Sequence, residues 1–153
     1  MPHPLDCEIR SDQRTDDPLR PTRILIAEDE VLVGYTLQLL LMSEFDCEVL
    51  GPFMRVCDAQ RAVLENEIDF AILDVRLRDG EIYPVADILF QRNIPFVFHS
   101  GHAEEEAIGA AYDGAPLLDK PASDSAIVRA IREALVEPFK VSTPEMTSRD
   151  RAR

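Results

Sequence analysis

The chain has 153 residues, of which 46% are hydrophobic, so it can form one domain with one core. Its formal net charge of −13 argues against direct binding to nucleic acid or to anionic membranes, because both need clustered Lys and Arg. No stretch approaches the roughly 20 apolar residues of a membrane span, and the first residues lack the apolar run of a signal peptide. We therefore expect a cytoplasmic protein.

The apolar pattern predicts strands that alternate with helices along the chain. In chain order, the expected strands span residues 23–27, 47–53, 69–75, 94–100 and 115–119. The expected helices span residues 31–45, 57–67, 83–93, 103–113 and 123–137, with Pro84 in a first helical turn and Ser123 as an N-cap. Residues 1–22 and 137–153 have no such pattern, so we expect flexible extensions around a domain over residues 23–136.

These strands are apolar on both faces, which indicates a parallel sheet covered by helices on each side. Right-handed crossovers between parallel strands make this a doubly wound, five-stranded α/β fold. In such folds ligands bind at the carboxyl ends of the strands. That edge is therefore where functional residues are expected.

Polar side chains follow four of the predicted strands. They are Glu28 and Asp29 after the first, Asp74 in the third, Ser100 after the fourth and Lys120 after the fifth. Carboxylates held close together repel one another unless a cation lies among them. Oxygen ligands without His or Cys favour a hard ion, and Mg²⁺ fits a site with few protein ligands. With Lys120 and a hydroxyl nearby, the site suits a phosphoryl group, and Asp74 is the expected nucleophile.

The motifs AEDE, LDV, HSGH and DKP, in this order, resemble those of the receiver domain of two-component response regulators. The resemblance covers residues 23–136 and implies a flavodoxin-like receiver fold. It implies that Asp74 accepts a phosphoryl group from the phosphohistidine of a histidine kinase. It also implies that Lys120 pairs with that group and that the hydroxyl of Ser100 follows it on activation.

For Mg²⁺, the resemblance implies that Asp29 and Asp74 are direct ligands and that Glu28 is a companion acid, often linked to the metal through water. The backbone carbonyl of Arg76 is a further implied ligand. The side chain of Arg76 has two open interpretations: it reaches over the site, or it is an ordinary surface arginine.

The segment PFVFHSGH is similar to the Pro-Phe-x-Phe-Ala-Thr-Gly-Tyr signature of the alphaproteobacterial single-domain receivers called FAT GUY. His99, Ser100 and His102 replace Ala, Thr and Tyr of that signature. Leu117 stands where most receivers carry a Tyr or Phe that swings inward on phosphorylation. Without that ring, we expect signalling through reordering of residues 101–113, and the resemblance points to an HWE-type or related histidine kinase as donor.

The two histidines and the cysteines favour structural roles. Packing is expected for His99 and exposure near the site for His102, in preference to a metal pair. The cysteines, Cys7, Cys47 and Cys57, lack metal-binding spacing, so we expect reduced thiols with two of them packed in the core.

The function that these observations favour is a stand-alone receiver that signals through another protein. It is not expected to be an enzyme beyond the chemistry of its own phosphorylation and dephosphorylation. No DNA-binding output domain is expected, since only 137–153 follow the domain. One alternative is a metal-dependent phosphohydrolase of the haloacid dehalogenase type, but these need an Asp two residues after the nucleophile, where this chain has Arg76. The other alternative is a receiver that binds partners without being phosphorylated.

Overall fold

Five parallel strands form the central sheet, in the order β2-β1-β3-β6-β7. The computed structural model describes residues 19–101, 108, 112 and 115–136, and the fold is reported for these residues. The order reverses at β1, which pairs with β2 on one side and β3 on the other. This is the predicted doubly wound sheet. Its strands are β1 (Thr22–Ala27), β2 (Cys47–Phe53), β3 (Phe70–Leu73), β6 (Phe96–Ser100) and β7 (Leu117–Asp119).

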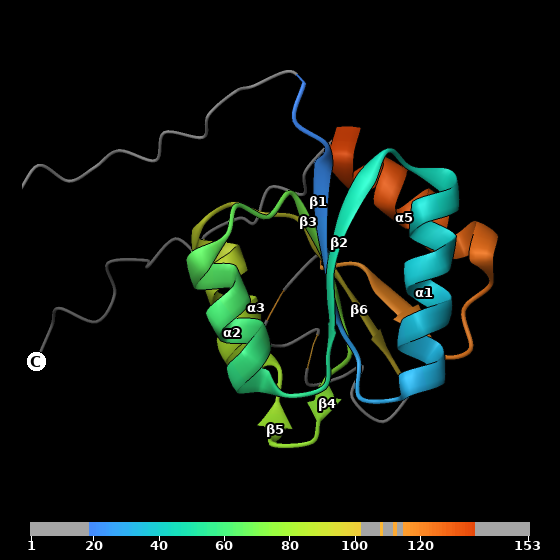
Figure 1. Ribbon diagram of the computed structural model, residues 1–153. Coiled ribbons are helices and arrows are strands. Elements are labelled where there is room, and N and C mark those ends of the chain that lie inside the picture. Colours follow the sequence, from blue (N-terminus) through green and yellow to red (C-terminus); the bar gives the residue numbers. More distant parts are fainter. Residues whose placement is uncertain (1–18, 102–107, 109–111, 113–114, 137–153) are drawn as a thin grey trace, which may run out of the picture.

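Helices cover both faces of the sheet, with α1 and α5 on one side and α2 and α3 on the other (Figure 1). Each pair of helices covers its own cluster of buried apolar side chains, so the sheet separates two half-cores. The predicted helix over residues 103–113 lies largely outside the described residues. The described helices are α1 (Val31–Glu44), α2 (Val56–Glu65), α3 (Tyr83–Gln91) and α5 (Asp124–Val136).

Local sequence signals explain where several of these elements begin. Pro84 lies in the first turn of α3, where its missing N–H has no intrahelical partner. The Ser123 hydroxyl accepts a hydrogen bond from the backbone N–H of Ala126 at 3.2 Å, which confirms it as the N-cap of α5. All four residues of β3 are buried, as expected for a central strand covered on both faces.

A short antiparallel hairpin, β4 (Arg76–Leu77) and β5 (Gly80–Glu81), follows β3 and was not predicted. Its turn residue Asp79 accepts hydrogen bonds from the backbone N–H groups of Val56, at 2.5 Å, and Cys57, at 3.2 Å. These groups belong to the first turn of α2. The hairpin therefore caps a helix that precedes it in the chain, and the segment after β3 is fixed against α2.

The expectation for the cysteines is only partly correct. Cys47 is half-buried and Cys57 is exposed, and both are free thiols. Cys57 lies on the outer face of α2, whose inner face is formed by Val56, Ala59, Ala62 and Val63, so the prediction of two core cysteines is wrong. Cys7 lies outside the described residues. Across the described part of the chain, no helix is long and apolar enough to cross a membrane.

Candidate functional site

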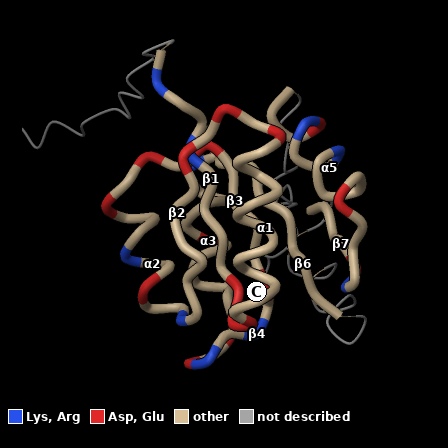
Figure 2. Tube along the Cα trace, turned by 45° about the vertical axis from the view of Figure 1, so that its right-hand side comes forward, with Lys and Arg blue, Asp and Glu red and all other residues tan. Residues whose placement is uncertain are grey.

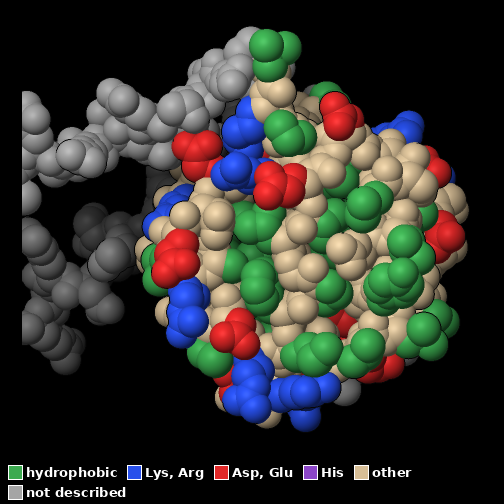
Figure 3. All heavy atoms as spheres, viewed as in Figure 1, with side chains coloured by type: hydrophobic (Ala, Val, Ile, Leu, Met, Phe, Trp, Pro, Cys, Tyr) green, Lys and Arg blue, Asp and Glu red, His purple; other side chains and the backbone are tan. Residues whose placement is uncertain are grey.

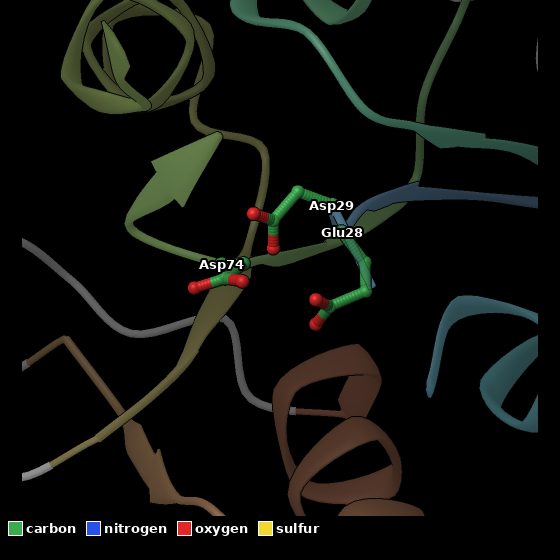
Figure 4. A group of neighbouring side chains, drawn as sticks. All are labelled: Glu28, Asp29 and Asp74. Atoms are coloured by element: carbon green, nitrogen blue, oxygen red, sulfur yellow. The ribbon is translucent and has the colours of Figure 1, made fainter. Parts of the chain in front are cut away.

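Three carboxylates meet at the carboxyl edge of the sheet, as predicted. Glu28 and Asp29 directly follow β1, and Asp74 directly follows β3. Backbone hydrogen bonds hold both segments: the N–H of Asp74 donates to Ala27, and that of Glu28 donates to Phe53, each at 2.9 Å. The three side chains point toward one another (Figure 4), and each offers an oxygen within 4.8 Å of the others. Glu28 and Asp74 are buried and Asp29 is half-buried.

Lys120 links two of these acids from the end of β7. Its Nζ lies 3.0 Å from Asp74 Oδ2 and 3.0 Å from Glu28 Oε2, and it donates a hydrogen bond to Glu28 Oε1 at 3.2 Å. Its backbone N–H donates to the carbonyl of Ser100 at 2.9 Å, which ties β7 to β6 at this edge. Lys120 thus contacts both Glu28 and Asp74, as expected for residues at the carboxyl ends of parallel strands.

The charges of the site are not balanced by protein groups alone. Burial raises the pKa of Glu28 to about 7, although the Glu30 N–H and Lys120 oppose the rise; the charge of Asp74 adds to it. Burial lowers the pKa of the Lys120 ammonium, but its hydrogen bonds and charge interactions with Glu28 and Asp74 outweigh that effect and raise it. Three carboxylates around one ammonium carry a net charge of −2 when all are ionised. Hard oxygen donors with this excess charge fit a divalent cation.

Ser100 and Arg76 lie on β6 and β4, and their implied roles at the site stay predictions. Ser100 is the last residue of β6 and is buried; its hydroxyl donates a hydrogen bond to the carbonyl of Gly101 at 3.2 Å. Arg76 begins β4, two residues after Asp74, and is exposed. Leu117 is half-buried at the start of β7. His102 and most of the segment 101–113 lie outside the described residues, so the expected role of that segment stays a prediction.

His99 belongs to the site more closely than the sequence suggested. It is 4% exposed, which confirms the expected packing, and its Nδ1 lies 4.0 Å from Glu28 Oε2. Burial and the neighbouring charge of Lys120 lower its pKa to about 4, opposed by Glu30, so the ring is neutral at physiological pH. The one signal in the sequence was the replacement of a small residue beside the hydroxyl position by an imidazole.

A cavity of about 500 Å³ opens beside this site, between α1 and the segment that leads into α5. Its wall is mostly apolar, and Glu30, His99 and Lys120 line the end nearest the carboxylates. The apolar part of the lining includes Leu32, Val33, Leu37, Leu40, Pro121 and Ile127.

A doubly wound sheet with clustered acids and a lysine at its carboxyl edge defines the class of protein, a receiver-type α/β domain. No family model matches the sequence. SdrG from Sphingomonas melonis Fr1 is 34% identical, with 76% of this chain and 97% of that chain covered and a TM-score of 0.61. The PhyR response regulator REC domain from Erythrobacter litoralis is 26% identical, with 82% and 98% covered and a TM-score of 0.67. The chain belongs to the response regulator receiver domains.

Curated relatives support the same family. The transcriptional regulatory protein PdtaR from Mycobacterium tuberculosis is 33% identical over 126 residues, which are 78% of this chain and 59% of that protein. The chain spans about half the length of the curated relatives it matches, between 46% and 59%. The similarity therefore identifies the domain and does not extend to the activity of the full-length relatives.

Proposed function

We propose that this receiver accepts a phosphoryl group on Asp74 from the phosphohistidine of a histidine kinase or phosphotransfer protein, with Mg²⁺ bound. The observation that carries the proposal is the position of Asp74, 3.0 Å from Lys120 and within one group of three carboxylates. A structural ion pair needs one acid and one base. The additional acids are explained by a cation that binds with the phosphoryl group.

The chain's own residues would act in the following way. A carboxylate oxygen of Asp74 attacks phosphorus, the bond from phosphorus to the donor nitrogen breaks, and its electron pair stays on the imidazole that leaves. Lys120 stabilises the negative charge on the phosphoryl oxygens, and the Ser100 hydroxyl turns toward one of them. Glu28, Asp29, Asp74 and the Arg76 carbonyl would hold Mg²⁺, which neutralises charge on the phosphoryl oxygens.

The partner surface that we propose is the outer face of α1. Residues 31–43 carry no charge, although the chain is strongly acidic, and the α1 tube is tan along this stretch in Figure 2. Figure 3 shows hydrophobic side chains gathered over the same helix. The exposed ones are Val31, Leu32, Tyr35, Leu39 and Met42. Because α1 begins two residues after Asp29, helices of a kinase or phosphotransfer protein that pack here would bring their histidine near Asp74.

The FAT GUY resemblance supports a more specific setting. We propose a cytoplasmic phosphorelay with an HWE-type histidine kinase as donor, and an output through protein contacts rather than DNA. Phosphotransfer from a panel of purified histidine kinases, HWE-type kinases included, would test it by comparing initial rates.

The direct test of the proposed function is the site of phosphorylation. The protein is incubated with Mg²⁺ and acetyl phosphate, and peptide mass spectrometry locates the added phosphoryl group. We expect it on Asp74, with no incorporation in EDTA or in the Asp74→Asn variant. Asp46→Asn, which changes an exposed acid outside the site, is the matched control and should be labelled like the unchanged protein. Label on another residue, or none on a folded protein, would contradict the proposal.

A further inference from the structure

Two buried groups of the site face each other without a hydrogen bond. Among the described residues, the buried side-chain atoms that lack a hydrogen-bond partner are Glu28 Oε2 and both ring nitrogens of His99. Glu28 is 1% exposed and His99 is 4% exposed, and Nδ1 and Oε2 are 4.0 Å apart. Lys120 Nζ, 3.0 Å from the same Oε2, compensates its charge.

Packing alone does not explain an imidazole at this position. A buried polar ring without a hydrogen bond is unfavourable, and a leucine of similar size would fill the same space without that cost. On β6 the neighbours of His99 are the apolar Phe98 and Ser100, whose hydroxyl donates to the Gly101 carbonyl, and the cavity that His99 lines is mostly apolar. Glu30 and Lys120 line the same end of that cavity, and the acceptor that lies 4.0 Å from Nδ1 of the ring is Glu28 Oε2.

Lys120 is shared between two acids in this structure, and a phosphoryl group on Asp74 would compete for it. The ammonium contacts Glu28 and Asp74 at nearly equal distances. A phosphoryl group adds negative charge beside Asp74, so Lys120 would turn toward it and away from Glu28. Glu28 would then keep only the hydrogen bond from the Glu30 N–H, which is 3.1 Å long.

We propose that His99 is a positioning residue that hydrogen-bonds Glu28 Oε2 when Lys120 turns to the phosphoryl group. This inference rests on the proposed function. The gap of 4.0 Å must close by about 1 Å to reach a normal hydrogen-bond length. With its proton on Nδ1, the neutral ring donates to the carboxylate. Glu28 is then held in place beside Asp29, and Lys120 is released to the phosphoryl oxygens.

The first test observes the ring itself. The chain has three histidines, and the His99→Gln spectrum assigns the signal of His99 among them. Imidazole ¹⁵N NMR is recorded with Mg²⁺ alone and with Mg²⁺ plus beryllofluoride, a phosphoryl mimic. We expect a protonated, hydrogen-bonded Nδ1 only with beryllofluoride. An imidazole signal that does not change between the two conditions would overturn the proposal.

The second test compares two replacements of His99. His99→Leu keeps the volume and removes the donor, whereas His99→Gln keeps an amide donor. We expect His99→Leu to weaken beryllofluoride binding by about tenfold, and His99→Gln to stay within about threefold of the unchanged protein. Equal binding by all three proteins would overturn the proposal. If His99→Leu does not fold, the ¹⁵N measurement on the unchanged protein decides.

The proposed phosphorylation of Asp74 and the role of His99 can be distinguished by experiment. If the unchanged protein neither binds beryllofluoride nor takes phosphate on Asp74, the proposed function is wrong, and the role of His99 is wrong with it. If the unchanged protein does both and His99→Leu behaves identically, only the role of His99 is wrong.

Discussion

Lys120 is the residue that makes burial of the acidic site tolerable. Its ammonium lies 3.0 Å from an oxygen of Glu28 and 3.0 Å from an oxygen of Asp74, and both acids are buried. Buried charges are costly unless they are paired, and here one cation serves two acids. The site is therefore held together and still incompletely neutralised, which leaves it able to take a divalent ion.

Gly34 shows how closely the scaffold approaches the site. A Cβ at this position would lie 2.8 Å from two ring carbons of Pro52 and 3.5 Å from Glu28 Cγ. Gly34 is buried in the first turns of α1, where its N–H donates to the Glu30 carbonyl at 2.9 Å. The missing side chain is what lets α1 pack against the end of β2 beside Glu28.

We predict that Gly34→Ala destabilises the protein, even though alanine is the better helix former. The gain in helix propensity is about 1 kcal/mol, and overpacking against the proline ring costs more, for a net loss of about 1 kcal/mol. Urea unfolding measures the difference. Gly101→Ala is the control, because no atom of the described residues lies within 4 Å of a Cβ there. Equal stability of Gly34→Ala and the unchanged protein would show that α1 can shift without cost.

Among the elements, the β4–β5 hairpin links the site to α2. Asp79 in its turn binds the first N–H groups of α2, and the N–H of Arg78 donates to the carbonyl of Met54 at 3.0 Å. The hairpin begins two residues after Asp74. The position of the peptide after the phosphoacceptor is therefore set by contacts with the β2–α2 connection.

We predict that Asp79→Ala lowers the melting temperature, because it leaves helix N–H groups of α2 without an acceptor. Hydrogen bonds from the Val56 and Cys57 N–H groups lower the pKa of Asp79 below its ordinary value of 3.8. The stabilisation is thus present above pH 3.8 and is lost as pH falls through the lower, folded-state pKa. Asp79→Asn keeps one acceptor oxygen and should show a smaller change. Thermal unfolding of the three proteins at pH 7 measures this, and identical midpoints would contradict it.

Over the whole molecule, charge and apolar surface are unevenly distributed. The net charge is −13, yet α1 exposes five large apolar side chains between Val31 and Met42 and carries no charge before Glu44. Large exposed apolar patches often mark the places where a protein binds a partner. Its position beside the carboxylates suits a partner that delivers a phosphoryl group.

We predict that Leu39→Glu on α1 slows phosphotransfer from a kinase that phosphorylates the unchanged protein, by about tenfold or more, corresponding to about 1.4 kcal/mol. Phosphorylation by acetyl phosphate should be unaffected, because a small donor needs no docking surface. Leu64→Glu on α2 is the matched control, since Leu64 is 55% exposed and Leu39 is 52% exposed. Initial rates with both donors measure the effect. Equal slowing by the two variants would place the docking surface elsewhere.

The sequence alone was sufficient to predict the order of the five sheet strands and of the described helices, and the convergence of the acids with Lys120. Hydrophobic periodicity is a local property, so the strands of the central sheet and the described helices could be located within a few residues. Parallel strands then bring their carboxyl ends to one edge, which made Glu28, Asp29, Asp74 and Lys120 neighbours without any knowledge of contacts. Their negative charges then predicted mutual repulsion, and with it a cation among them.

The tertiary structure alone decided features that depend on contacts between distant segments. Asp79 caps a helix that begins 23 residues earlier, and no local pattern links Asp79 to Val56. The approach of His99 to Glu28 joins side chains from β6 and the end of β1, and the exposure of Cys57 depends on which face of α2 meets the sheet. Such contacts arise when elements pack against one another, so their energies are set by three-dimensional neighbours and leave no periodic trace in the sequence.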